Sequence, residues 1–243
     1  MIEIYEPVGT APELRHSRLL SAMQTTIDYI NEHGEIGLTQ TKAFNHKFTL
    51  WAAENFDWPE YSAVELLKLN KVLNEDDVLP VLVVHDLLIL MKLGRHYKGA
   101  FKLTEKAKTL ENTPGALFVS LAETYLFEYN HGRTSRFNET APGNWDIFLN
   151  IINVESEGGV SEAALVKIFY GLEKNPDSFD RDYHMHKSFL FTHVLRPLTW
   201  IGFLAETLTG TDYLAPRLYS KTPLWRLCLK LDTDNMVQNP TQN

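Results

Sequence analysis

The longest apolar stretch of the chain runs from Val81 to Leu93. If this stretch is helical, apolar side chains cover nearly its whole circumference, with His85 and Asp86 near the middle, and a helix that is apolar all round is buried. It is shorter than the roughly 18 apolar residues that a membrane span requires. Pro80 suits a first helical turn, and Gly94 suits a helix end. The pattern therefore predicts a central core helix, with a buried strand as the alternative for its first half.

A short basic hairpin is predicted directly after this helix. Arg95–Tyr97 and Ala100–Leu103 have the composition of two strands, and Lys98-Gly99 between them suits a tight turn. Apolar and basic positions alternate in the second strand, so one face of the hairpin is expected to be buried and the other to be in solvent. Thr104 is a candidate cap for a further helix. The order helix, glycine, basic hairpin and helix is typical of a winged helix-turn-helix.

Helical periodicity also surrounds this segment in the first half of the chain. A short strand precedes the second helix, where it could pair with the hairpin. The expected elements are a helix over Glu13–Glu32 closed by Gly34, the strand Ile36–Thr39, a helix from a Thr41 cap to Asn55, and helices over Ser62–Leu69 and Ala116–Tyr129.

The second half of the chain repeats this order of elements without repeating the sequence. We expect helices over Trp145–Val154, Ala163–Leu172 with a Ser161 cap, and Tyr183–Leu204, which Pro197 kinks or divides, then strands at Tyr213–Ala215, Arg217–Tyr219 and Leu224–Leu231. The predicted fold is mainly α (α+β), with two tandem winged-helix-like modules that carry short β-hairpins. Residues 1–130 form the first module, 131–144 a loop or linker, 145–231 a second, degenerate module, and 232–243 a flexible tail.

Four short motifs carry a resemblance to a known family. They are Gly37–Thr41, Asn70–Asn74, Leu93–Arg95 and Gly99–Thr104. With them, about residues 34–130 resemble the winged-helix-like region of a plasmid-borne family of "third open reading frame"-like proteins of unassigned function. The resemblance implies a fold, and it implies no catalytic residue.

Charge is distributed unevenly along the 243 residues. The chain has a formal net charge of −8, which disfavours non-specific nucleic-acid binding by its whole surface. Between Lys92 and Lys108, however, six basic residues and Glu105 give a local net charge of +5. Cys228 is the one cysteine, which fits a reducing compartment, and its apolar neighbours suggest an inert buried thiol. The first residues lack a signal-peptide pattern, so we expect a cytoplasmic protein with no membrane partner.

The hairpin is the leading candidate for a binding surface, because Lys and Arg on a hairpin can contact phosphates. The core helix is too apolar to read bases, so polar residues of the helix before it are better placed. The candidate nucleic-acid-binding residues are Lys42, Asn45, Lys47, Arg95, His96, Lys98 and Lys102. The alternative is a solvated hairpin whose lysines only protect a sheet edge.

Other chemistry has weaker support in the sequence. Asp180, Asp182, His184, His186 and His193 are the one cluster of metal-ligand types, but they match no zinc-binding spacing. Surface or capping roles are expected for this cluster, and a core position for His193. The acidic run Glu75–Asp77 suits a helix N-terminus, and we expect no metal and no cofactor.

Three functions remain open from the sequence. The first is a non-catalytic DNA-binding or regulatory protein that contacts duplex DNA through the basic hairpin. The second is an acidic interaction module that docks a protein partner, and the third is an enzyme of unrecognised type. The sequence predicts no particular oligomeric state.

Overall fold

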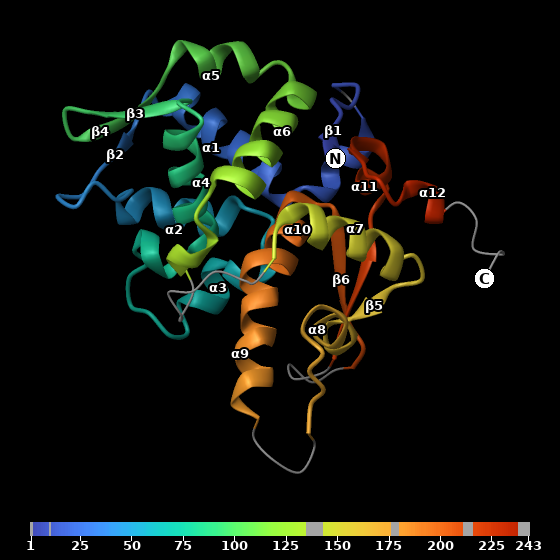
Figure 1. Ribbon diagram of the computed structural model, residues 1–243. Helices are drawn as coiled ribbons and strands as arrows, with labels where there is room; N and C mark the ends of the chain where they lie inside the picture. Colours follow the sequence, from blue (N-terminus) through green and yellow to red (C-terminus); the bar gives the residue numbers. More distant parts are fainter. Residues whose placement is uncertain (1, 10, 135–142, 176–179, 211–215, 238–243) are drawn as a thin grey trace. The chain divides into compact units, whose positions relative to one another are not determined.

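A computed structural model describes residues 2–9, 11–134, 143–175, 180–210 and 216–237 (Figure 1). The chain is mainly helical with small antiparallel sheets, as the sequence predicts. It divides into two compact units, which are Glu6–Tyr125 and the combination of Met1–Tyr5 with Leu126–Asn243. Among the described residues, no helix has the length and apolar character needed to cross a membrane.

The first unit surrounds one largely apolar helix, α4, with other helices and a three-stranded sheet of order β2-β4-β3. Its helices are α1 (Arg18–His33), α2 (His46–Asn55), α3 (Ala63–Leu66), α4 (Leu79–Leu90), α5 (Glu105–Leu110) and α6 (Pro114–Glu123), with 3-10 turns at Pro12–His16, Pro59–Tyr61 and Glu75–Asp77. Its strands are β2 (Ile36–Gly37), β3 (Gly94–Tyr97) and β4 (Ala100–Leu103), all antiparallel. The predicted hairpin and its pairing with the strand after α1 are therefore confirmed.

Helix α4 is the core of this unit, and the strand alternative is wrong. Its first three turns are almost entirely buried, and α1 packs against it. Its last residues, Ile89 and Leu90, are exposed, and Leu79 and Asp86 are partly exposed. Burial of this many aliphatic side chains stabilises the unit by about 1.5–3 kcal/mol for each side chain removed from water.

The end of α4 differs from the prediction. The helix ends at Leu90, and Lys92 rather than Gly94 takes the left-handed conformation, with φ of 59°. Gly94 instead opens β3, where a Cβ atom would lie 2.0 Å from the ring of Phe101. The glycine is therefore needed because a buried aromatic ring packs directly on its backbone.

Helix α2 also begins later than predicted. Asn45, not Thr41, is its cap, and the Asn45 side chain accepts a hydrogen bond from the N–H of Phe48 at 3.0 Å. The preceding residues form a turn in which Lys42 has a φ of 68°. A cap satisfies backbone N–H groups that the first helical turn leaves unpaired.

The second unit contains a sheet of order β5-β7-β6 and a separate pair of strands, β1 with β8. Its helices are α7 (Trp145–Glu155), α8 (Glu162–Tyr170), α9 (Arg181–Leu190), α10 (Arg196–Ile201), α11 (Pro223–Cys228) and α12 (Asp234–Val237), with a π-helical turn at Phe191–Leu195 and a 3-10 turn at His131–Thr134. A second π-helical turn, Thr124–Glu128, follows α6 at the boundary between the units. The strands are β1 (Glu3–Ile4), β5 (Val160–Ser161), β6 (Leu204–Leu208), β7 (Arg217–Lys221) and β8 (Leu229–Lys230).

Two predictions for this half need correction. The helix expected to continue to Leu204 ends at Ile201, where Gly202 has a φ of 91°. The segment Leu224–Leu231, expected as a strand, is mostly the helix α11. The short helix α12 lies within the stretch expected to be a flexible tail. Ser161 caps α8 as predicted, and the strand expected at Tyr213–Ala215 lies outside the described residues.

The two units share one local structure where a helix passes into a hairpin. In the first unit the N–H of Leu93 donates to the carbonyl of Leu88 at 2.8 Å, and the Thr104 hydroxyl donates to the carbonyl of Lys92 at 2.8 Å. In the second unit, the N–H of Phe203 donates to the carbonyl of Leu198 at 2.9 Å.

The second unit also has a counterpart of the Thr104 hydrogen bond, since the Thr222 hydroxyl donates to the carbonyl of Gly202 at 2.6 Å. In both sheets the short first strand pairs with the last strand of the hairpin. Two modules of the same topology, which the sequence predicted only from the order of elements, are therefore confirmed.

Candidate nucleic-acid interface

The hairpin β3–β4 of the first unit, called the wing below, projects beside β2 and α5 (Figure 1). Its turn is Lys98-Gly99, and both residues have positive φ, 49° and 80°. This geometry matches the right-handed twist of the two strands, and glycine adopts it without strain. The four paired positions from Gly94↔Leu103 to Tyr97↔Ala100 fix which side chains share a face.

The outer face of the wing carries an aromatic ring surrounded by cations. Arg95, Tyr97 and Lys102 share this face, because Arg95 pairs with Lys102 and Tyr97 lies two residues further along β3. The Arg95 Cζ lies 5.7 Å, the Lys98 Nζ 5.3 Å and the Lys102 Nζ 6.0 Å from the centroid of the Tyr97 ring. The ring itself is 45 % exposed. Three of the seven predicted binding residues therefore gather around a tyrosine that the sequence reading did not select.

One of these cations has an acidic partner. The Lys102 Nζ lies 3.0 Å from a carboxylate oxygen of Glu35, and both side chains are about half exposed. Exposed ion pairs contribute little, typically below about 1 kcal/mol. The pair therefore weakens the positive field of the wing without preventing Lys102 from contacting a phosphate.

The inner face of the wing is anchored to the core through a chain of three ionisable side chains. The His96 Nε2 lies 2.9 Å from the Nε2 of His85, whose Nδ1 lies 2.9 Å from a carboxylate oxygen of Glu75. Because a carboxylate only accepts, the Nδ1 of His85 carries the hydrogen. In a neutral ring its Nε2 is then the acceptor for the Nε2–H of His96. His96 was predicted to contact nucleic acid, but its imidazole is turned toward His85.

Contacts with Phe44 hold Glu75 and His85 in place. The N–H of Phe44 also donates to the Glu75 carboxylate, and the Phe44 ring stacks on His85 with centroids 3.9 Å apart. Burial lowers the pKa of His96 below its usual value, and the nearby His85 and Lys42 lower it further, whereas Glu75 acts in the opposite direction. Glu75 lies in the first turn of the 3-10 helix before α4, which agrees with the expected helix-terminal position, but its side chain is only 4 % exposed.

The three candidates before the core helix have different positions. Lys42 is exposed on the turn before α2 and lies near His96, and Lys47 is exposed in the first turn of α2. Asn45 is committed to capping α2, and its amide packs where a Cβ atom of Gly37 would be. Both lysines are therefore exposed, and Lys42 lies near the His96 end of the wing.

The second unit shows no comparable arrangement of its predicted cluster. Asp180 caps α9 by accepting from the N–H groups of Asp182 and Tyr183, and His186 Nδ1 bonds the Asp182 carbonyl at 2.9 Å. Among the described residues, no three His, Cys, Asp or Glu side chains converge as metal ligands would. The thiol of Cys228 is fully buried, as predicted.

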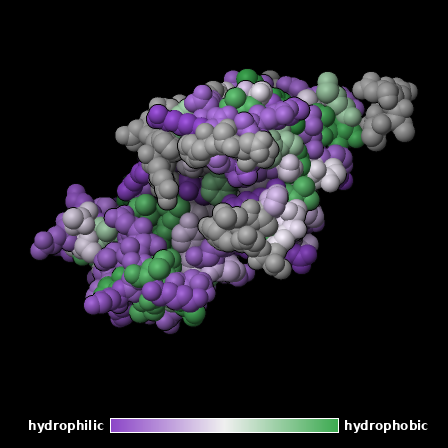
Figure 2. All heavy atoms as spheres, turned by 90° about the horizontal axis from the view of Figure 1, so that it is seen from below, coloured by the Kyte–Doolittle hydropathy of each residue, from purple (hydrophilic) through white to green (hydrophobic). Residues whose placement is uncertain are grey.

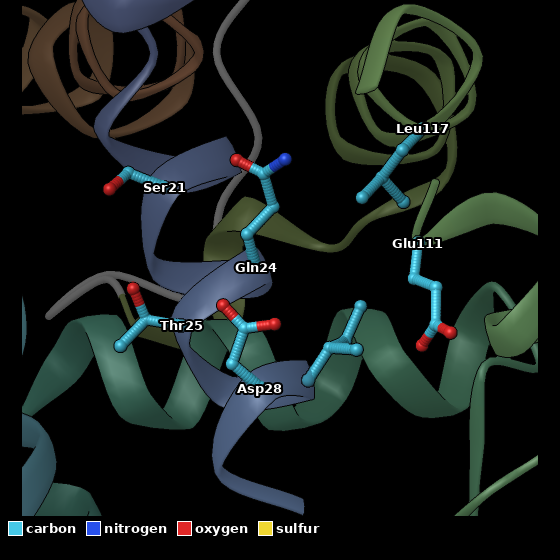
Figure 3. A pocket seen from close by; sticks show the side chains of 7 residues that line it. Ser21, Gln24, Thr25, Asp28, Glu111 and Leu117 are labelled. Atoms are coloured by element: carbon cyan, nitrogen blue, oxygen red, sulfur yellow. The ribbon is translucent and has the colours of Figure 1, made fainter. Parts of the chain in front are cut away.

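A polar groove of about 370 Å³ lies elsewhere on the first unit (Figure 3). It is lined by Ser21, Gln24, Thr25, Ile27 and Asp28 of α1 and, on its other side, by Glu111 and Leu117. Two carboxylates line this groove, and Glu111 also accepts a hydrogen bond from Asn31 at 2.9 Å. This electrostatic character disfavours phosphate and leaves the wing as the candidate interface.

The comparisons with known proteins assign a family to both halves of the chain. Residues 15–116 match the model of the y4jL N-terminal domain, and residues 135–223 match that of the y4jL C-terminal domain. The uncharacterized protein y4jL of Sinorhizobium fredii (strain NBRC 101917 / NGR234) is 38 % identical over 162 residues, which cover 66 % of this chain and 74 % of that protein. No solved structure matches the chain. The resemblance to an uncharacterised family is thus confirmed, and the chain belongs to the y4jL family.

Proposed function

We propose that the first unit is a winged-helix domain that binds DNA through the phosphate backbone, in a non-catalytic and regulatory role. The order of its elements supports this assignment, because the helices α1, α2, α3 and α4, with the short strand β2 after α1, are followed by a hairpin that closes a β2-β4-β3 sheet. In such domains a hairpin contacts the backbone beside a helix that enters a groove. We further propose a cytoplasmic location and the plasmid-borne origin that the resemblance implies.

The outer face of the wing is the observation that carries the proposal. Arg95, Lys98 and Lys102 all lie within about 6 Å of one exposed ring, on a chain whose overall charge is negative. Like charges gathered on a small surface repel one another, and binding to phosphates relieves that repulsion. The exposed Lys42, which lies near His96, adds to this basic surface on the side of α2.

The mode of contact follows from what α4 exposes. At its end this helix presents Ile89 and Leu90, which offer no hydrogen bonds to base edges. The proposed binding is therefore directed mainly at the backbone and has low sequence selectivity.

The test is duplex binding as a function of salt, measured by fluorescence anisotropy. Each phosphate contact contributes about −0.9 to the slope of log K against log salt, so the double variant Lys98→Glu with Lys102→Glu should reduce the slope by about 2 and abolish binding at 150 mM salt. Lys68→Glu with Lys71→Glu is the matched control, since it makes the same charge change at exposed positions of the same unit. Equal losses in both variants, or no binding by the native protein at low salt, would contradict the proposal.

A second candidate function, docking of a protein partner, has its own support. Apolar side chains around α3 are unusually exposed, with Val64 at 73 % and Leu69 at 87 %, and Leu67 and Val72 are exposed beside them. Hydrophobic residues also reach the surface in patches on the face drawn in Figure 2. Contiguous exposed apolar surface is typical of interaction sites.

The two functions give opposite results with two pairs of substitutions. If the protein docks a partner through α3, Val64→Asp with Leu69→Asp should abolish recovery of that partner from a host lysate. Lys98→Glu with Lys102→Glu should leave that recovery unchanged. A partner lost only with the wing variant would argue against docking at α3.

A further inference from the structure

We propose that the outer face of the wing is a platform for an unpaired nucleobase, which stacks on Tyr97 while Arg95, Lys98 and Lys102 bind the flanking phosphates. The inference rests on the proposed function, because it concerns the same hairpin. It extends that function by naming the form of nucleic acid that the wing prefers, namely a single-stranded tail, bubble or loop next to duplex.

Tyr97 is not needed to build the core. It lies on the outer face of β3 and is 45 % exposed, whereas Phe101 on the inner face of β4 is fully buried and fills the space under the sheet. Three cations lie over the exposed ring of Tyr97, at 5.3–6.0 Å from the ring centroid.

An aromatic ring among cations matches the chemistry of a single-stranded nucleotide. Base stacking on aromatic side chains is tolerant of sequence, because every base has a π-face, and it acts together with a positively charged surface that follows the backbone. Bases within a duplex already stack on each other and present only their edges in the grooves. A ring on a strand can therefore reach a base face only where pairing is absent.

The platform is held rigidly, which reduces the entropy lost on binding. Behind β3, the bond between His96 and His85 ties the strand to α4, and Glu75 orients His85 in turn. Beside it, the tight Lys98-Gly99 turn directly follows Tyr97 and fixes the backbone at this end of β3. Tyr97 is thus presented in one place instead of being on a mobile loop.

The experiment compares a blunt duplex with the same duplex carrying a six-nucleotide single-stranded tail, using the full chain and fluorescence anisotropy. The tail should raise affinity for the native protein, and Tyr97→Ala should lose that gain, by about 5- to 150-fold, the range measured for removing one stacking residue. Tyr97→Phe keeps the ring and should retain the gain. Tyr5→Ala is the matched control, because Tyr5 is also 45 % exposed but lies beside Glu3 in the second unit.

The outcomes separate this inference from the function on which it rests. If Tyr97→Ala binds the blunt duplex like the native protein and loses only the gain from the tail, the platform is supported. If the tail gives no gain, or Tyr97→Ala keeps it, the platform is wrong while duplex binding still stands. Tails of DNA and of RNA, tested in parallel, identify which source of unpaired bases the wing prefers, and crosslinking of a 5-bromouracil tail to Tyr97 should report the stacked base directly.

Discussion

Replacing Glu75 by Gln should destabilise the first unit far more than an ordinary loss of one surface charge. The carboxylate is 4 % exposed and accepts two hydrogen bonds, from the backbone N–H of Phe44 and from the Nδ1 of His85 at 2.9 Å. Both bonds end on the same oxygen, Oε2. A glutamine of the same shape can place its one acceptor oxygen there, so it keeps both bonds but makes each of them neutral instead of charge-assisted.

The size of the effect follows from these contacts. Hydrogen bonds to charged groups contribute about 1.5–3 kcal/mol, and neutral ones about 0.5–1.5 kcal/mol. Each of the two bonds therefore loses about 1–1.5 kcal/mol, and we expect Glu75→Gln to lower the free energy of unfolding by roughly 2–3 kcal/mol, out of a typical total of about 5–15 kcal/mol. With urea m-values of about 1–3 kcal/mol/M, the midpoint should fall by about 1–2 M.

Urea denaturation followed by circular dichroism measures this loss, and hydrogen exchange of peptides from Glu6–Tyr125 assigns it to the first unit. The control is Glu65→Gln, which removes an exposed carboxylate paired with Lys68 at 2.7 Å and should change stability by less than about 0.5 kcal/mol. If Glu75→Gln lowers the free energy of unfolding by less than about 1 kcal/mol, or by no more than the control does, the charge on Glu75 does not stabilise the fold.

Three further substitutions test other parts of the structure. Gly94→Ala should cost about 1–3 kcal/mol, because its Cβ would lie 2.0 Å from a buried ring, whereas Gly158→Ala meets no atom within 4 Å and should be nearly neutral in the same melts. Asn45→Ala should lower the free energy of unfolding by about 0.5–2 kcal/mol, and Thr41→Ala should lower it much less. The reverse order would indicate that Thr41 caps α2. The pKa of His96 is lowered on folding, so the unfolded chain binds more protons below the usual value of 6.5, and stability should fall as pH drops from there through the lowered pKa. His96→Gln should flatten this pH dependence, and an unchanged curve would contradict the cause assigned to it.

The sequence predicted those elements whose signals are local. The apolar circumference of α4, the Lys98-Gly99 turn and the Ser161 cap each lie within a few residues of the structure that they specify. The order of helices and hairpins followed from these signals, and it correctly indicated two modules.

The errors fall at ends of elements, where local signals conflict. Lys92 ends α4 although lysine rarely takes positive φ, so no glycine marked the position. Gly202 did mark the end of α10, but the apolar residues that continue after it concealed the change from helix to β6. The short stretch Leu224–Leu231 fits either a helix or a strand by composition, and only the Thr222-Pro223 start favours the helix that forms.

The sequence could not predict the contacts of the candidate site, because they join residues that are distant along the chain. Glu75, His85 and His96 are ten and eleven residues apart along the chain, and their hydrogen bonds depend on how α4 and β3 pack. A histidine in an otherwise apolar helix does signal that some buried partner exists, because an unpaired polar group there is costly. It does not identify that partner.

The wing has one face that the sequence predicts and one that it does not. Its outer face follows from local alternation and carries the cations and Tyr97, whereas its inner face depends on a long-range chain that fixes β3 to α4. If the outer face binds nucleic acid, the inner face determines how precisely the ring and cations are presented. Glu75→Gln should then weaken binding to a tailed duplex under conditions where the variant is still folded, although no atom of Glu75 lies on the binding surface.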